Sequence, residues 1–132
     1  MPTLKPAQVA TFQARLQARR QQLGDEIRRV QEERADTPAA RMPDTANPDD
    51  PPGDQVDQAE RRTRLAVRDA EVARDEAELR DIEAALERIA AGSFGECIDC
   101  AVDIAVRRLD VQPAAARCLP CQEQYEKSHP AG

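Results

Sequence analysis

The chain has 132 residues, which is room for one ordinary domain or two small ones. Of these residues 33% are charged, 2% are aromatic and none is tryptophan. This composition argues against a large globular core and is typical of long helices or a coiled coil. No apolar run approaches the ~20 residues of a membrane span, and the N-terminus lacks the apolar core of a signal peptide. We therefore expect a soluble, cytoplasmic, all-α protein.

Residues 6–34 are predicted to form a helix. Pro6 suits a first-turn position, where its missing N–H costs nothing. Apolar side chains then recur at steps of three, four or seven residues and make one stripe, formed by Val9, Phe12, Leu16, Leu23, Ile27 and Val30. A helix with a single apolar stripe needs a single partner.

Residues 35–53 interrupt this pattern and contain five of the ten prolines. Proline is excluded from helix interiors and also restricts the residue before it. The segment is therefore predicted to be a loop. Loops of this length are usually functional or disordered.

A second helix is predicted over residues 54–91, where apolar residues again repeat every seven positions. The stripe comprises Leu65, Val72, Leu79 and Leu86, joined by Ile82 and Ile89. Gly92 stands where a C-terminal helix cap is expected.

Two helices with one stripe each most simply fold back on one another as an antiparallel coiled-coil hairpin over residues 1–91. Matching the stripes places Val30 near Leu65 and Val9 near Leu86. The loop then forms the tip of the hairpin, and residues 92–132 follow at its base.

Two cysteine pairs mark residues 92–132. The pattern is C-x2-C-x17-C-x2-C, which has the spacing of a four-cysteine zinc site, with ligands Cys97, Cys100, Cys118 and Cys121. A fully protein-ligated site leaves no open position for a substrate water, so we expect one structural Zn²⁺. The alternatives are two disulfides, which need an oxidising compartment, and a redox C-x-x-C, which needs a surrounding βαβ pattern that is not seen.

The same segment has too few basic residues for a DNA-binding finger. Four stand against six acidic residues: Arg107, Arg108, Arg117 and Lys127. A finger that grips DNA should show a basic stripe, so direct sequence-specific nucleic-acid binding is not expected. Residues 92–132 are expected to end in a short C-terminal helix, with Tyr125 as a packing residue in it and His129 as a surface residue.

A pair of acidic residues opens the second predicted helix. Asp54 and Asp57 are three residues apart and lie on roughly one side of its first turn. They could cap the helix and complement its dipole. They could also act on a partner from the hairpin tip, and the two roles are compatible because a carboxylate has several lone-pair sites.

The chain resembles the DksA/TraR family from about Asp54 to Tyr125. The similar features are the D-x-x-D-x-A string of the tip, the segment 92–100 (GSFGECIDC), and Arg107-Arg108-Leu109, Pro113 and Cys118-x-x-Cys121. The resemblance implies a bacterial transcription regulator that binds RNA polymerase through its secondary channel, with no DNA site. It also implies that Asp54, Asp57 and Ala59 form the effector tip near the catalytic centre and that the four cysteines hold the metal.

The chain departs from members of the family that respond to guanosine tetraphosphate (ppGpp). Those proteins present basic groups where this chain has Asp81, Gln112 and Gln122. A multivalent phosphate needs Arg or Lys donors, so weak or absent alarmone binding is expected. Ala101 also replaces the glycine that many relatives carry after the second cysteine.

Other functions are less well supported by the sequence. A zinc-stabilised coiled-coil adaptor for another protein, or a polymerase factor like those that assist transcript cleavage, are the alternatives. An enzyme is not expected, since no nucleophile–base pair, phosphate-cradling loop or open metal site is apparent. A monomer is expected.

Overall fold

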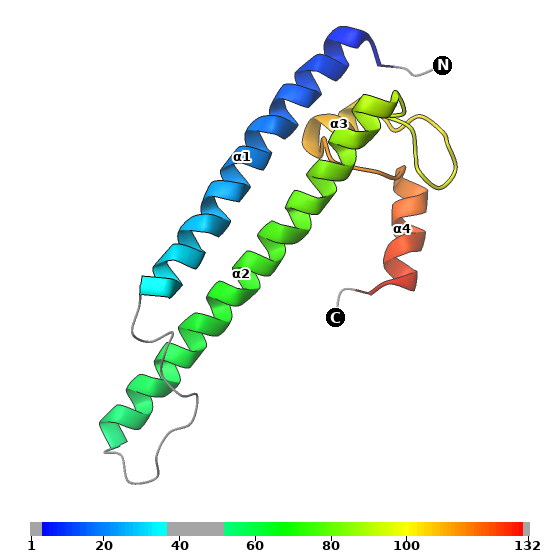
Figure 1. Cartoon of the computed structure of the whole chain (residues 1–132). Helices are drawn as coiled ribbons and strands as arrows, with labels where there is room; N and C mark the ends of the chain where they lie inside the picture. The colour runs from blue at the N-terminus through cyan, green and yellow to red at the C-terminus, as the bar shows by residue number, and fades with distance from the viewer. Residues whose placement is uncertain (1–3, 37–51, 131–132) are drawn as a thin grey trace. The chain divides into compact units, whose positions relative to one another are not determined.

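The computed structural model describes residues 4–36 and 52–130. Within these two ranges four helices follow in order: α1 (Pro6–Asp36), α2 (Pro52–Ala91), α3 (Val106–Val111) and α4 (Leu119–Ser128) (Figure 1). In these residues the β-type pairing is a single bridge between Glu96 and Asp103. The predicted fold class is confirmed: the protein is all-α, with an antiparallel pair of long helices and a small C-terminal four-cysteine module.

The helix boundaries differ slightly from those predicted. Helix α1 continues to Asp36 and α2 begins at Pro52, so most of the predicted loop 35–53 lies outside the described residues. Helix α2 ends at Ala91, and Gly92 follows with φ +80°. The Gly92 N–H donates to the Ile89 carbonyl and the Ser93 N–H to the Arg88 carbonyl, which is the expected glycine C-cap.

The chain divides into two compact units, which we describe separately. The cysteine unit comprises Met1–Gln21 and Leu79–Gly132, and the helix-pair unit comprises Gln22–Glu78. In residues 4–36 and 52–130, no helix has a stretch that is long and apolar enough to cross a membrane.

Most of the buried apolar side chains belong to the cysteine unit. They come from the start of the chain and α1, from the end of α2, and from the segment that carries the cysteines: Leu4, Phe12, Leu16, Ile82, Ala85, Phe94, Cys97, Ile104 and Leu109. Arg15 of α1 adds a polar link, since its Nη2 donates to the backbone carbonyl of Asp110 at 2.8 Å. The core of this unit therefore holds the beginning of α1 against the cysteine segment.

A glycine is required at position 95 by both conformation and space. Gly95 has φ +91°, and a Cβ atom there would lie 2.7 Å from Leu4 Cδ1. The Gly95 carbonyl accepts a 2.7 Å hydrogen bond from the Ile104 N–H. The side chain of Leu4 thus packs directly against the backbone of Gly95, two residues before Cys97.

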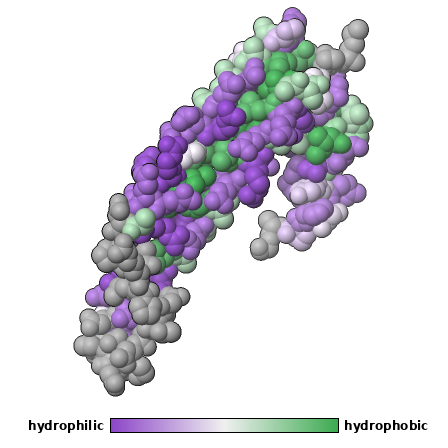
Figure 2. Space-filling model, viewed as in Figure 1, coloured by the Kyte–Doolittle hydropathy of each residue, from purple (hydrophilic) through white to green (hydrophobic). Residues whose placement is uncertain are grey.

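The helix-pair unit has a thinner apolar seam. Leu23 and Val30 of α1 are buried, whereas Leu65 and Val72 of α2 are only half-buried. In Figure 2 apolar side chains gather where the two helices meet, and hydrophilic residues cover most of the rest of the visible helix surface. This agrees with one apolar stripe on each helix.

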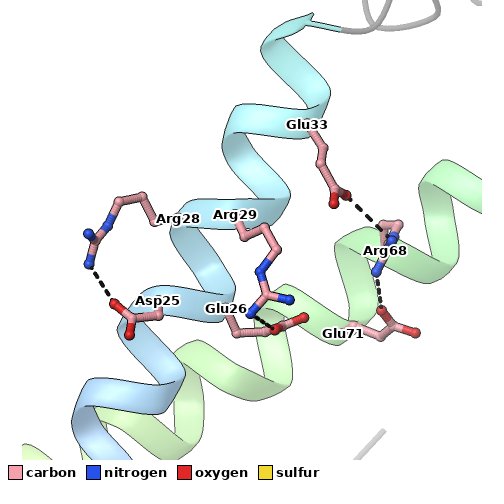
Figure 3. Close-up of polar contacts among 7 residues, drawn as sticks. All are labelled: Asp25, Glu26, Arg28, Arg29, Glu33, Arg68 and Glu71. Carbon is pink, nitrogen blue, oxygen red and sulfur yellow. Dashed lines mark hydrogen bonds and ion pairs between the residues drawn. The ribbon is translucent and has the colours of Figure 1, made fainter.

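Ion pairs show the register of the two helices in this unit. The Nη2 atom of Arg68 on α2 lies 3.5 Å from the Oε2 atom of Glu33 on α1 (Figure 3). Arg34 of α1 likewise forms an ion pair with Asp69 of α2. Val30, one turn before Glu33, therefore lies opposite the turn of α2 that contains Val72. The predicted pairing of Val30 with Leu65 is wrong by one heptad, because a stripe that repeats every seven residues matches its partner equally well after such a shift.

Candidate metal centre and helix tip

The first cysteine pair lies on a tight backbone turn. The Cys97 N–H donates to the Val102 carbonyl at 2.8 Å, and the Ala101 N–H donates to the Cys97 carbonyl at 2.9 Å. Ala101 has φ +64°, the left-handed conformation that glycine adopts more easily. Ala101, which stands where the family resemblance led us to expect glycine, thus adopts a conformation typical of glycine.

The second cysteine pair is positioned by the start of helix α4. Cys118 is the N-cap residue, with φ −65° and ψ 164°. Cys121 follows in the first turn, and proline at the start of the helix suits a position with no intrahelical N–H partner. The Ile98 N–H donates to the Ala116 carbonyl at 2.9 Å. This hydrogen bond connects the turn of the first cysteine pair to the segment that precedes the second cysteine pair.

The structure brings all four predicted cysteines together. Their Sγ atoms lie within 4.8 Å of one another, and Cys100 Sγ is 3.7 Å from Cys118 Sγ. A tetrahedral ion with Zn–S bonds of about 2.3 Å requires S–S edges of about 3.8 Å. All four cysteines are free of disulfides, so the two-disulfide alternative is wrong. The donor set and its spacing fit one structural zinc ion.

The protonation of the thiols depends on their local surroundings. Burial raises the pKa of the Cys97 thiol, but backbone N–H donors overcome this effect and lower the pKa to about 6. Those donors belong to Cys118, Cys100 and Asp99. The neighbouring sulfurs of Cys118 and Cys100 raise the pKa of Cys121. Metal binding must therefore displace a proton from Cys121, whereas Cys97 is largely ionised at neutral pH.

Charged and aromatic side chains surround the cysteines in a way that the sequence analysis missed. Arg117 Nε donates to Asp99 Oδ2 at 2.8 Å, and Arg117 Cζ lies 3.9 Å from the centre of the Tyr125 ring. A signal was present in the sequence, since Asp99 and Arg117 are opposite charges that each stand one residue before a ligand, Cys100 and Cys118.

The two residues predicted to have no chemical role lie on helix α4 and at its end. Tyr125 is 38% exposed and stacks on His129, with ring centroids 4.3 Å apart and planes at 16°. His129 is exposed, as expected for a surface residue. Tyr125 packs as expected, but against the His129 ring and Arg117 and not in the apolar core.

The acidic tip residues lie at the start of helix α2. Because α2 begins at Pro52, Asp54 lies inside its first turn and not at the capping position. Asp57 and Ala59 are exposed, and Val56, directly before Asp57, is 57% exposed. An acidic side chain is therefore presented to solvent at this end of α2 in the helix-pair unit.

The three positions considered for alarmone recognition all fall in the cysteine unit. Asp81 is exposed on α2, and Gln112 is the exposed C-cap residue of α3. Gln122 of α4 donates through Nε2 to Glu126 at 3.1 Å. None of these three side chains supplies the positive charge that a polyphosphate requires.

The chain is similar to known proteins over its cysteine module and over most of its length. A family model described as the prokaryotic dksA/traR C4-type zinc finger matches residues 92–127. The RNA polymerase-binding transcription factor DksA of Escherichia coli strain K12 is 33% identical over 123 residues, which cover 93% of this chain and 74% of that protein. DksA of Salmonella typhimurium strain LT2 is 32% identical over the same shares.

A solved structure extends the similarity to three dimensions. The transcription factor DksA2 from Pseudomonas aeruginosa matches with a TM-score of 0.72 and 30% sequence identity. The match covers 94% of this chain and 87% of that one. Both the long helices and the cysteine module thus have counterparts in a protein of the same architecture.

Proposed function

This chain belongs to the DksA/TraR family of four-cysteine zinc-finger proteins, and we propose that it is a bacterial transcription regulator that binds RNA polymerase. The observation that carries this proposal is the similarity over 93% of the chain to proteins named RNA polymerase-binding transcription factors. The similarity includes the long helices as well as the metal module. A shared zinc finger alone would have supported a much broader range of partners.

The acidic start of helix α2 is the proposed effector site. In this proposal residues 1–91 form an arm that enters the polymerase secondary channel, and residues 92–132 form the zinc module at its base. Asp54, Asp57 and Ala59 then act near the catalytic centre and alter the lifetime of open complexes. The exposure of Asp57 and Ala59 supports this role, because a carboxylate at the end of a helix can reach a metal ion or basic loops of a partner.

The remaining parts of the proposal concern partners and location. We expect a cytoplasmic monomer that has no catalytic turnover of its own and recognises no DNA sequence. Residues 92–132 support the last point, because they carry four basic residues against six acidic ones and Arg117 is committed to Asp99 and Tyr125. Direct DNA binding would need a basic surface.

Two measurements test the proposal. The first is retention of the purified zinc-loaded protein by core RNA polymerase, and the second is the lifetime of open complexes with wild-type protein or with the Asp54→Asn/Asp57→Asn variant. We expect the variant to bind polymerase and to lose the effect on lifetime. The matched control is Glu76→Gln/Glu83→Gln, which removes two exposed carboxylates elsewhere on α2 and should keep the effect.

The outcomes separate the alternatives. Absence of binding to polymerase would favour an adaptor for a different protein. Binding with equal loss of effect in both double variants would show that the overall charge of α2 matters and not the tip. Stimulated transcript cleavage that depends on Asp54 and Asp57 would favour the cleavage-factor alternative.

Weak or absent response to guanosine tetraphosphate is tested in the same assay. We expect the effect on open-complex lifetime to be nearly the same with and without the nucleotide, because Asp81 repels phosphate and the two glutamines offer no charge. Strong synergy would contradict this part of the proposal while leaving polymerase binding intact.

A further inference from the structure

We infer that Arg117 is a positioning residue of the metal centre: its side chain holds the two cysteine pairs and helix α4 in the arrangement that retains zinc. The residue stands directly before Cys118, yet only 20% of its side chain is exposed. A long cationic side chain on a small module is usually much more exposed. Three sets of contacts fix the position of this residue.

The first contact joins Arg117 to the other cysteine pair. Arg117 Nε donates to Asp99 Oδ2 at 2.8 Å, and Asp99 lies between Cys97 and Cys100. The ion pair therefore crosses from the second metal-binding segment to the first. It is a short, charge-assisted hydrogen bond, which is stronger than a neutral one.

The second contact joins Arg117 to helix α4. The guanidinium carbon lies 3.9 Å from the centre of the Tyr125 ring, well within the range of cation–π attraction. The Tyr125 ring in turn stacks on His129, whose Nδ1 lies 3.1 Å from the Tyr125 carbonyl oxygen. Guanidinium, phenol and imidazole thus form a chain of contacts that runs along α4 from the residue before Cys118.

The third contact fixes the main chain of Arg117. Arg108 Nε donates to the Arg117 carbonyl oxygen at 3.1 Å. Arg108 belongs to helix α3 and precedes Leu109, which is completely buried. Through Arg108 the backbone just before Cys118 is therefore connected to the helix that carries the buried Leu109. This contact holds the main chain from which the Arg117 side chain extends.

Charge gives these contacts a consequence for the metal. Four thiolates around one Zn²⁺ leave the site with an excess of two negative charges, and the Arg117 guanidinium is held on Asp99, which stands between the ligands Cys97 and Cys100 in the chain. Groups that orient metal ligands from outside are worth roughly 10–100-fold in metal affinity. Loss of the Arg117 side chain should loosen Cys118 relative to Cys100 and allow zinc to escape faster.

The test uses the full-length, zinc-loaded protein and an excess of a colorimetric zinc chelator. We expect zinc transfer from Arg117→Gln to be about tenfold faster than from wild type. The matched control is Arg107→Gln, which removes the same charge from an exposed position on α3 that takes no part in these contacts. Release at the wild-type rate from Arg117→Gln, or equal acceleration in both variants, would overturn the inference.

A spectroscopic measurement distinguishes positioning from simple stability. The chain has one tyrosine and no tryptophan, so the near-ultraviolet circular dichroism of tyrosine reports on Tyr125 alone. We expect this signal to collapse in Arg117→Gln while the far-ultraviolet helix signal persists, and to be unchanged in Arg107→Gln. An unchanged tyrosine signal in Arg117→Gln would overturn the assigned stacking.

Further variants keep the inference testable if Arg117→Gln does not fold. Tyr125→Leu retains Arg117 and its ion pair, and we expect release several-fold faster than wild type, whereas a wild-type rate overturns the role of the ring. Arg117→Lys keeps the charge but lacks the planar fork, so we expect it to release zinc faster than wild type, and full rescue by lysine would overturn the positioning role. Adding Asp99→Asn to Arg117→Gln should accelerate release little further, and additive effects would contradict the shared contact.

Discussion

The rings of Phe12 and Phe94 pack with their centroids 5.9 Å apart and their planes inclined at 53°. They are the two phenylalanines of the chain, and both are almost completely buried. Phe12 comes from helix α1 and Phe94 from the segment that leads to Cys97. Tilted aromatic pairs are favourable beyond their burial alone, so this contact fastens the start of α1 to the metal-binding segment.

The same core is expected to depend on Leu109, whose side chain has no exposed surface. Leu109→Ala should lower the free energy of unfolding by about 2–5 kcal/mol, because it removes buried methyl groups and leaves a cavity. Urea denaturation of the zinc-loaded protein, followed by circular dichroism, measures the change. Val111→Ala on the same helix is the control: Val111 is 80% exposed, and its loss should change stability by no more than about 0.5 kcal/mol.

Gly24 lies inside helix α1 without a packing reason for glycine, since a Cβ atom there would meet nothing within 4 Å. Gly24→Ala should raise the free energy of unfolding by about 1 kcal/mol, because alanine loses less backbone entropy in a helix. Thermal and urea denaturation should both report the gain. A loss of stability would mean that the glycine serves a conformation other than the helix described.

Gly95→Ala is expected to have the opposite effect. The new Cβ would lie 2.7 Å from Leu4 Cδ1 at a backbone φ of +91°, and overpacking of this kind costs about 1–3 kcal/mol. The two causes can be separated by measuring the same substitution in a Leu4→Ala background. There the steric conflict is relieved and only the conformational cost of the left-handed backbone should persist.

Ala101→Gly should stabilise the cysteine unit by about 1 kcal/mol, because Ala101 has φ +64° and a left-handed conformation is costly for residues with a Cβ. The zinc-loaded protein should unfold at a higher urea concentration. Ala90→Gly provides the comparison: Ala90 lies in helix α2, so the same chemical change there should destabilise by about 1 kcal/mol. Similar effects at both positions would contradict the conformational explanation.

Zinc affinity should fall as the pH is lowered, and the fall should steepen below about pH 6. The raised pKa of Cys121 means that its proton competes with zinc throughout the neutral range. The lowered pKa of Cys97, about 6, means that this thiol is ionised and favours binding above that pH. It takes up a proton as the pH falls through 6, which adds a further competitor. Competition with a chelator of known pH dependence, from pH 8 to pH 5, measures the slope.

A constant slope across this range would indicate that Cys97 carries its proton at neutral pH. Counting protons released on zinc binding at pH 7, by calorimetry in buffers of different ionisation enthalpy, provides an independent check. Fewer than four protons are expected, since the four ligands include one that is already largely ionised.

The sequence by itself determined the helices and the metal ligands. Apolar residues repeating every seven positions define a helix and its buried face, and the two C-x-x-C pairs define four thiolate ligands. Both signals are local, because each depends on residues close together in the chain. The two long helices were therefore predicted to within about two residues of their observed ends, and all four cysteines were assigned before their geometry was known. The short helix α3 was not predicted.

Only the tertiary structure decided how these parts meet. The apolar repeat allows the two helices to slide by a heptad without loss of matching, and the ion pairs of Arg68 with Glu33 and of Arg34 with Asp69 exclude the register that the stripes suggested. The packing of Phe12 on Phe94 and the contacts of Arg117 likewise join residues that are distant in the chain or on different turns. Their pairing depends on shape and charge in three dimensions, which a one-dimensional repeat does not contain.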